Sequence, residues 1–253
     1  MRRPKIKKDD ERNSVAVVTD LQVEPHQRPL DLEVKIDDVL VHRTPSGVAR
    51  SLRYLLAVGD LPNRFSVTAA IPGEGVTSIS RSLAALIAND WLGSTCWVDL
   101  NWWSADLQHE SDLFNVTIVD VVEGRNLVAD LPVATSVRGL FFVAAGHVPV
   151  SSRFRLPRSE ALAHVIGELA HQFDYLVLDL PPVLTTSDAL SLGALADGYF
   201  LVVRQRVTTS TQVAAALRAM SAVPCLGTIL NGSRTRVPRW LHTSNEMWAL
   251  GDT

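Results

Sequence analysis

The spacing of apolar residues changes repeatedly along this chain of 253 residues, and the changes mark a succession of strands and helices. Short, nearly continuous apolar runs indicate buried strands, whereas apolar residues recurring every three or four positions indicate amphipathic helices. The predicted strands cover residues 64–70, 94–100, 138–146, 174–180, 198–204 and 225–231. The predicted helices cover residues 77–91, 158–173, 187–196 and 209–220.

This alternation predicts an α/β fold, with a mostly parallel central sheet covered by helices on both faces in a three-layer α/β/α arrangement. Leu52, Leu55 and Leu56 share a face within residues 45–58, which predicts a further amphipathic helix before the first of these strands. Right-handed crossovers in such a fold place ligands at the carboxyl ends of the strands.

Residues 1–38 are rich in charge and proline and show little periodicity, so we predict a flexible charged N-terminal tail followed by one domain over residues 39–253. The basic start "MRRPKIKK" fits contact with an anionic membrane surface or a solvated chain end. Asp9, Asp10 and Glu11 follow at once and favour the solvated end.

Composition limits the class of protein. A net charge of -3 and a pI near 6.2 argue against general nucleic-acid binding. The apolar runs stop well short of the ~20 residues of a membrane span, and the charged start lacks the apolar core of a secretory signal. We therefore expect a cytoplasmic protein, in which Cys96 and Cys225 are reduced thiols.

The segment "AAIPGEGVTSISRSLA", residues 69–84, lies between a predicted strand and a predicted helix and has features of a phosphate-binding loop. Such loops aim backbone N–H groups at the anion, while a lysine adds a mobile charge and a Ser or Thr hydroxyl holds the metal. Gly75 and Thr77 fit this pattern, but Val76 stands where the lysine belongs, and no lysine follows Lys35. A glycine-rich turn without a ligand is the alternative interpretation.

Two carboxylates occupy the ends of predicted strands. Asp99 ends "CWVDL" and Asp179 ends "YLVLDL", each after apolar residues, as a magnesium-binding carboxylate would. If magnesium binds, Thr77, Asp99 and Asp179 are its candidate ligands.

Several ordered segments between residues 45 and 240 resemble one protein family: "TAAIPGEGVTSISRSLA", "CWVDLNWWSA", "GLFFVAAGHVPV", "FDYLVLDLPPV" and "DALSLGALADGYFLVVRQRVT". They are similar to motifs of the bacterial tyrosine kinases of capsule and exopolysaccharide synthesis, P-loop ATPases related to MinD and ParA. The resemblance implies a P-loop NTPase-like fold in which Asn231 recognises the nucleotide base. The phosphate loop would comprise Gly73, Glu74, Gly75, Val76, Thr77 and Ser78.

The departures from this family concern its chemistry. The loop lysine aligns with Val76, the second carboxylate after the Asp99 strand aligns with Asn101, and the following arginine aligns with Trp103. Family members also end in a tyrosine cluster that is phosphorylated between subunits, whereas the last segment here, "NEMWALGDT", contains no tyrosine. We therefore expect a degenerate kinase whose phosphotransfer is absent or vestigial.

The family forms rings through a Glu-x-x-Arg-x-x-Arg helix. Arg50 and Arg53 match its arginines and are candidate interface residues, but Gly47 occupies the glutamate position, which makes ring assembly doubtful. Trp102 and Trp103 either form an exposed patch that docks a partner, or at least one of them packs on a helix while Trp97 lies in the core.

The resemblance thus implies a pseudokinase that requires no cofactor and regulates export by binding a membrane polysaccharide co-polymerase at the membrane periphery. Weak binding of ATP or ADP with magnesium is compatible with this. One alternative is an ATP-binding protein or autokinase that uses an arginine or a partner residue instead of lysine. Arg204 and Arg206 follow a strand and either approach the site or, as the pattern favours, serve surface solvation or ion pairing, whereas Arg81 should point away from the loop. Another alternative is a MinD-like surface switch.

Overall fold

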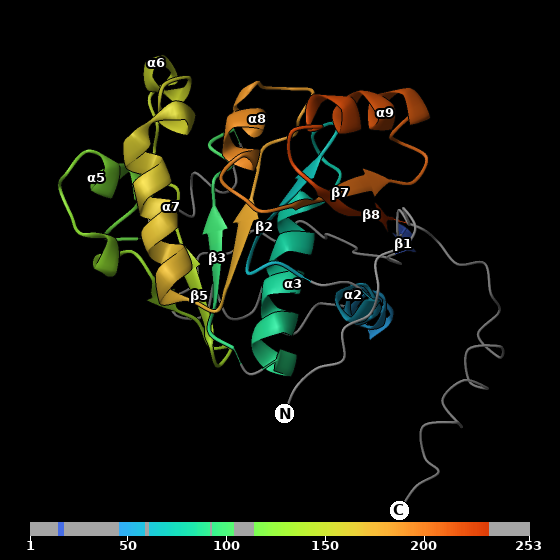
Figure 1. Cartoon of the computed structure of the whole chain (residues 1–253), viewed down its shortest axis with the longest axis horizontal. Helices are drawn as coiled ribbons and strands as arrows, with labels where there is room; N and C mark the ends of the chain where they lie inside the picture. Colours follow the sequence, from blue (N-terminus) through green and yellow to red (C-terminus); the bar gives the residue numbers. More distant parts are fainter. Residues whose placement is uncertain (1–14, 18–45, 59–60, 92, 104–113, 233–253) are drawn as a thin grey trace, which may run out of the picture.

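The computed structural model describes residues 15–17, 46–58, 61–91, 93–103 and 114–232. Its centre is an eight-stranded sheet in the order β1-β8-β7-β2-β6-β3-β5-β4 (Figure 1). Neighbouring strands are parallel except β4 and β5, which are antiparallel. The strands are β1 (Val15–Val17), β2 (Arg64–Ala69), β3 (Thr95–Asp99), β4 (Val133–Ala134), β5 (Leu140–Val143), β6 (Tyr175–Asp179), β7 (Tyr199–Arg204) and β8 (Cys225–Asn231).

Helices connect most of the strands, as expected for parallel pairs. Local signals set some of their ends: α7 begins after Ser159, whose hydroxyl accepts a hydrogen bond from Leu162 N at 3.2 Å. The helices are α2 (Ser46–Val58), α3 (Val76–Trp91), α5 (Ile118–Val122), α6 (Val150–Arg153), α7 (Glu160–Gln172), α8 (Asp188–Gly193) and α9 (Ser210–Ala219), with the 3-10 helices η1 (Val128–Asp130) and η2 (Leu156–Arg158).

Side chains of β3 and β6 alternate between two buried clusters, one on each face of the sheet, and those of β7 alternate between the first of these and a third cluster. On β3, Trp97 belongs to the cluster that includes α2 and α3, whereas Cys96 and Val98 belong to the cluster that includes α5 and α7. On β6, Val177 belongs to the cluster that includes α2 and α3, and Leu178 belongs to the cluster that includes α5 and α7. The three-layer α/β fold predicted from the sequence is therefore confirmed.

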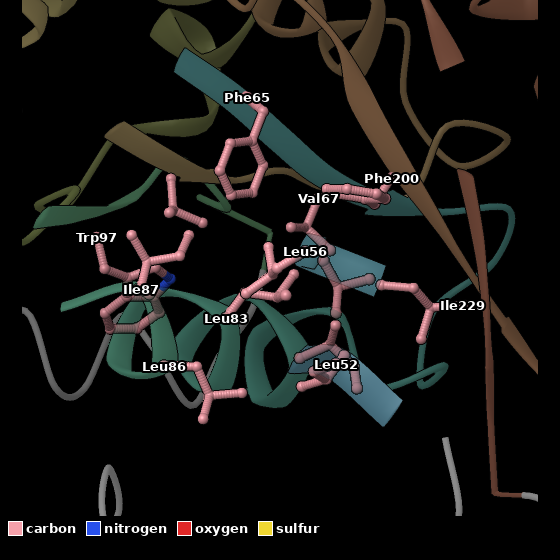
Figure 2. Packing of buried hydrophobic residues seen from close by; sticks show 14 of the residues in the cluster. Leu52, Leu56, Phe65, Val67, Leu83, Leu86, Ile87, Trp97, Phe200 and Ile229 are labelled. Atoms are coloured by element: carbon pink, nitrogen blue, oxygen red, sulfur yellow. The ribbon is translucent and has the colours of Figure 1, made fainter. Parts of the chain in front are cut away.

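The α2 and α3 face is closely packed around large aliphatic and aromatic side chains. Figure 2 shows Leu52 and Leu56 of α2 and Leu83 of α3 gathered against side chains from the sheet. On the sheet side, Phe65 and Phe200 meet edge to face, with ring centroids 5.5 Å apart. This packing fixes the start of α3 relative to β2, and therefore the loop between them.

One prediction fails in the N-terminal region. Val15–Val17 lie within the stretch predicted as a flexible tail, but they form β1 and pair in parallel with β8, Val15 facing Thr228. The tail prediction was therefore wrong for these three residues. The rest of residues 1–45 lies outside the described part of the chain.

Between β3 and β5, where the apolar residues show no regular spacing, the described residues 114–139 contain α5, η1 and the short strand β4. None of the helices in the described ranges combines the length and apolar character that crossing a membrane requires.

Truncating a core residue of α3 tests the packing. Leu83→Ala removes a side chain with no exposed surface, and we expect the free energy of unfolding to fall by about 2–5 kcal/mol because a cavity remains. Urea denaturation measures the change. Leu127→Ala is the control, since Leu127 is 71% exposed and its truncation should cost less than about 0.5 kcal/mol. Equal losses in both variants would contradict the packing described.

Candidate functional site

The turn between β2 and α3 has the backbone geometry of an anion-binding loop. Gly73 and Gly75 adopt φ values of +79° and +92°, in the left-handed region that favours glycine. A Cβ atom on Gly75 would lie 2.3 Å from Asn231 Nδ2, so no other residue fits there without a rearrangement. The first hydrogen bond of α3 runs from Ile79 N to Gly75 O at 3.0 Å, so the N–H groups of residues 76–78 have no acceptor within the helix.

A buried glutamate holds this loop in place. Glu74 has no exposed surface; its Oε2 accepts from Ile71 N at 2.9 Å, and its Oε1 accepts from Arg204 N at 3.1 Å and from the Thr208 hydroxyl. Asn231 Nδ2 donates to the carbonyl oxygen of Glu74 at 2.9 Å. The loop is thus tied to the ends of β7 and β8 by its own chain.

The sequence placed Glu74 in the loop without indicating this role. The signal available in the sequence was a single carboxylate between two glycines, Gly73 and Gly75. The loop that holds it lies at the carboxyl edge of the sheet, where β7 also ends. Asn231 is buried, and its Oδ1 accepts from Gly232 N at 2.7 Å, so both ends of its amide contact the chain itself. Its predicted recognition of a nucleotide base stays a prediction.

Val76 contributes an apolar side chain at the position predicted for the lysine. It is 7% exposed and belongs to the buried cluster that includes Leu52 and Ile229. Thr77 and Ser78 follow it in the first turn of α3. The loop therefore presents backbone dipoles to an anion, but its Val76 position brings no positive charge.

The arginines considered as substitutes for the lysine differ in where they lie. Arg204 Nη1 donates to the carbonyl oxygen of Gly73 at 2.8 Å, so this guanidinium lies on the carbonyl side of the loop. Arg206 has φ +65° and is exposed. The expectation that Arg81 points away was wrong: its guanidinium carbon lies 4.6 Å from the Trp97 ring centroid, and its charge acts on Asp179.

Two buried carboxylates lie beside the loop. Asp99 and Asp179 are register partners across β3 and β6, and both are buried. Asp99 Oδ1 accepts from Asn101 N at 2.8 Å, whereas neither Asp179 carboxylate oxygen accepts a hydrogen bond of normal geometry from a described residue, although the Thr77 and Ser80 hydroxyls lie close enough to lower its pKa. A buried carboxylate without such hydrogen bonds is a position where an oxygen-seeking cation would restore the lost interactions.

The surroundings of Asp179 change its acidity. Burial and, next, the negative charge of Asp99 raise the pKa of Asp179 to about 8, although the nearby Thr77 hydroxyl, the Arg81 charge and the Ser80 hydroxyl oppose the rise. The described part of the chain contains no group of three or more His, Cys, Asp or Glu side chains that could hold a metal ion.

The residues therefore fit a bound Mg-nucleotide only in part. Asp179, Asp99 and Thr77 are the oxygen donors available to a divalent cation, and the N–H groups of α3 suit a phosphate. The cation that would face the terminal phosphates is missing at Val76, and Asn101 replaces the second carboxylate. We therefore derive no phosphotransfer step from this site.

The predicted interface residues differ in their environment. Trp102 is 1% exposed and its indole N–H lies 3.4 Å from Ala145 O, so the prediction of an exposed patch formed by both tryptophans was wrong. The alternative, with Trp97 in the core and one of the pair packed inside, is confirmed. Trp103 is partly exposed, and its indole N–H donates to Asp188 Oδ2 at 3.1 Å.

On α2, Arg50 and Arg53 are exposed, and Gly47 lies in the first turn of the helix. Arg53 forms a two-point ion pair with Asp90 at the end of α3, in which Nη2 and Oδ1 are 3.1 Å apart. Arg53 therefore already has a carboxylate partner within the chain. Its predicted role in an interface, and that of Arg50, stay predictions.

Sequence comparison relates the chain to curated tyrosine kinases. No protein-family model matches the sequence. The tyrosine-protein kinase YwqD of Bacillus subtilis (strain 168) is 26% identical over 171 residues, 66% of this chain and 71% of that protein. The tyrosine-protein kinase Etk of Escherichia coli (strain K12) is 26% identical over 178 residues, 67% of this chain but only 24% of that protein.

The match likewise spans under a third of the putative tyrosine-protein kinase in the cps region of Klebsiella pneumoniae, 29% of its length. Among solved structures, the kinase domain of Escherichia coli Etk superposes with a TM-score of 0.70 at 20% identity, over 88% of this chain and 91% of that chain. MinD of Pyrococcus horikoshii, solved with Mg-ADP, superposes with a TM-score of 0.54 at 21% identity, over 71% of this chain and 75% of that chain.

Homologues of this chain are thus bacterial tyrosine-protein kinases of capsule and exopolysaccharide systems, and its fold is that of the Etk kinase domain and of MinD-like P-loop ATPases. The resemblance inferred from the motifs is confirmed. The structural likeness supports the fold and no more.

The role of Glu74 predicts a large effect of a very small change. Glu74→Gln places an amide N–H₂ group among backbone and hydroxyl donors, so we expect the free energy of unfolding to fall by about 1–3 kcal/mol. Chemical denaturation measures it, with the exposed Glu160→Gln as the matched control. A Glu74→Gln variant as stable as the wild type would show that the buried carboxylate does not hold the loop.

The pKa of Asp179 predicts a pH dependence of stability. Because this pKa is raised from its ordinary value of 3.8 to about 8, the folded state keeps a proton that the unfolded state loses, and stability falls as pH rises across that window. Asp179→Asn removes the titrating group and therefore this loss of stability. The free energy of unfolding of the variant, relative to that of the wild type, should rise by roughly a few kcal/mol from the acidic to the alkaline end of the window.

Thermal unfolding across this pH range measures the gain. Asp197→Asn is the control, because the Asp197 side chain is 50% exposed. The stability of this variant relative to wild type should not increase steadily with pH. A difference between Asp179→Asn and wild type that stays constant with pH would rule out the raised pKa.

Proposed function

We propose that this chain is a tyrosine pseudokinase-like regulatory protein of exopolysaccharide or capsule biosynthesis and export, which acts by binding a membrane polysaccharide co-polymerase. The observation that carries the proposal is the buried apolar side chain of Val76 at the position of the loop lysine, in a sequence with no lysine after Lys35.

The charge balance at the site supports this proposal. A charged hydrogen bond contributes about 1.5–3 kcal/mol, and phosphoryl transfer depends further on positive charge around the transferred group. Arg204 is engaged with the Gly73 carbonyl group, and Asn101 cannot supply the charge of a second carboxylate. The metal and the triphosphate both lose support, so phosphotransfer is absent or vestigial and no cofactor is required.

The retained shape supports a binding role. Glu74 and Asn231 hold the loop through contacts within the chain, so the domain keeps its surface without a nucleotide. Its homologues belong to capsule and exopolysaccharide systems, whose membrane co-polymerase is the partner we propose. The domain over residues 39–253 would then lie in the cytoplasm at the membrane periphery and would bind no nucleic acid; residues 1–38 would be its N-terminal tail, apart from Val15–Val17, which pair with β8.

The second candidate is a non-standard P-loop ATP-binding protein or autokinase. Two observations favour it: the Asp179 carboxylate accepts no hydrogen bond of normal geometry from the described residues, and the Arg204 guanidinium already contacts the loop. A shift of Arg204 from the Gly73 carbonyl group to a bound phosphate would supply the missing charge. A partner residue could supply it in the same way.

Titration with Mg-ATP and Mg-ADP, followed by calorimetry, distinguishes these candidates. We expect no appreciable binding to the wild type. Val76→Lys should gain about ten- to a hundredfold in affinity, because it restores a charged contact of about 1.5–3 kcal/mol. Val76→Met, which lengthens the side chain without charge, is the matched control and should gain nothing.

Micromolar binding by the wild type, abolished by Arg204→Ala, would instead establish the arginine-dependent ATP-binding protein.

Co-sedimentation with membranes that contain the co-polymerase tests whether the chain binds this partner. It should be equal for wild type and Val76→Met, with or without nucleotide, and its absence would contradict the regulatory role.

A further inference from the structure

Arginine and aromatic side chains gather where α6 and η2 meet the residues after β3; this group, here named the arginine–tryptophan patch, comprises Trp103, Arg153, Phe154, Arg155 and Arg158. The Arg153 guanidinium carbon lies 5.0 Å from the Trp103 ring centroid, and the rings of Trp103 and Phe154 are 6.4 Å apart in an edge-to-face arrangement. Trp103 is 37% exposed and Phe154 is 55% exposed. The patch therefore combines apolar surface with positive charge.

Hydrogen bonds fix the side chains of Trp103, Arg153 and Arg158 before any partner binds. The carboxylate of Asp188, which is 1% exposed, accepts from Trp103 Nε1 at 3.1 Å and from Arg158 Nη1 at 3.3 Å. Arg158 Nη2 also donates to Ser187 Oγ at 3.1 Å, and Arg153 Nε donates to Val148 O at 3.1 Å. Binding would thus cost little side-chain entropy.

The patch has more positive than negative charge. Among the described residues, its three arginines have one carboxylate partner, Asp188, which pairs with Arg158. In the described ranges, no ion pair involves Arg153 or Arg155, and Arg155 is exposed. Carboxylates of a partner would therefore find two arginines without a charge partner.

The position of the patch relates it to the loop. Trp103 follows β3, whose last residue is Asp99, and Asp188 begins α8, which follows β6 and Asp179. Both strands end at the carboxyl edge of the sheet, where the loop after β2 also lies. Figure 1 shows α6 and α8 at the same end of the domain.

We infer that the arginine–tryptophan patch docks an acidic segment of a protein partner, in which carboxylates flank apolar or aromatic residues. This inference rests on the proposed binding function and names the chemistry of the partner. Tryptophan, arginine and exposed aromatic side chains dominate the binding energy of protein interfaces. A lipid surface would attract each arginine by only about 1 kcal/mol and needs a larger basic cluster, and the net charge of -3 disfavours nucleic acid.

Fluorescence anisotropy with the full chain tests the inference. The probe is a fluorescein-labelled peptide in which glutamates flank a Leu–Phe pair; the same peptide with lysines in place of the glutamates is the charge control. We expect the acidic peptide to bind, more weakly as salt rises, and Arg155→Glu to weaken it roughly tenfold or more. Phe154→Ser should weaken it as well.

Arg218→Glu on α9 is the matched control for charge reversal, since Arg218 is also exposed, and it should bind as the wild type does. Equal binding of the peptide by wild type and Arg155→Glu would overturn the inference. So would Arg155-dependent binding to phosphatidylserine vesicles without any binding to the peptide. Nucleotide affinity is measured in a separate experiment. Tight Mg-ATP binding would therefore contradict the pseudokinase proposal without contradicting the inference about the patch.

Discussion

The parallel register of three neighbouring strands is the constraint on which the candidate site depends. β6 lies between β2 and β3, pairing Val67 with Asp179 on one side and Asp99 with Asp179 on the other. Because parallel strands end at one edge of a sheet, the loop after β2 and both carboxylates must meet there. Hydrogen bonds beyond the strands, such as Leu100 N to Asp179 O at 3.0 Å, extend this order into the following loops.

Within that frame, the chain itself supplies contacts that hold the phosphate-type loop. Glu74 lies buried beneath it, and Asn231 supports the turn from β8. The Arg204 guanidinium donates to a carbonyl group of the loop, whereas the Arg153 guanidinium lies over the ring of Trp103 in the arginine–tryptophan patch. The loop is thus held by contacts within the chain, and the arginine that touches it is engaged with a carbonyl group.

The fold was predictable because the hydrophobic pattern repeats with the period of each element. Strands buried on both faces and helices with one apolar face are visible in local sequence, and all of them occur near the predicted bounds. β1 was not predictable in this way. Val15–Val17 is a short run among charged and polar residues; valine favours extended backbone, but the pairing that makes the run a strand is with β8, which is distant in sequence.

At the site, the residue types were already evident from local sequence: a loop with Val76 in place of lysine, and aspartates at the ends of two strands. The folded arrangement of the strands and helices set what these residues contact. It gave Glu74 its donors from β7, separated buried Trp102 from partly exposed Trp103, and brought the charge of Arg81 to Asp179. The reason is physical: spacing along the chain sets local conformation, whereas hydrogen bonds, burial and pKa depend on elements that meet only after folding.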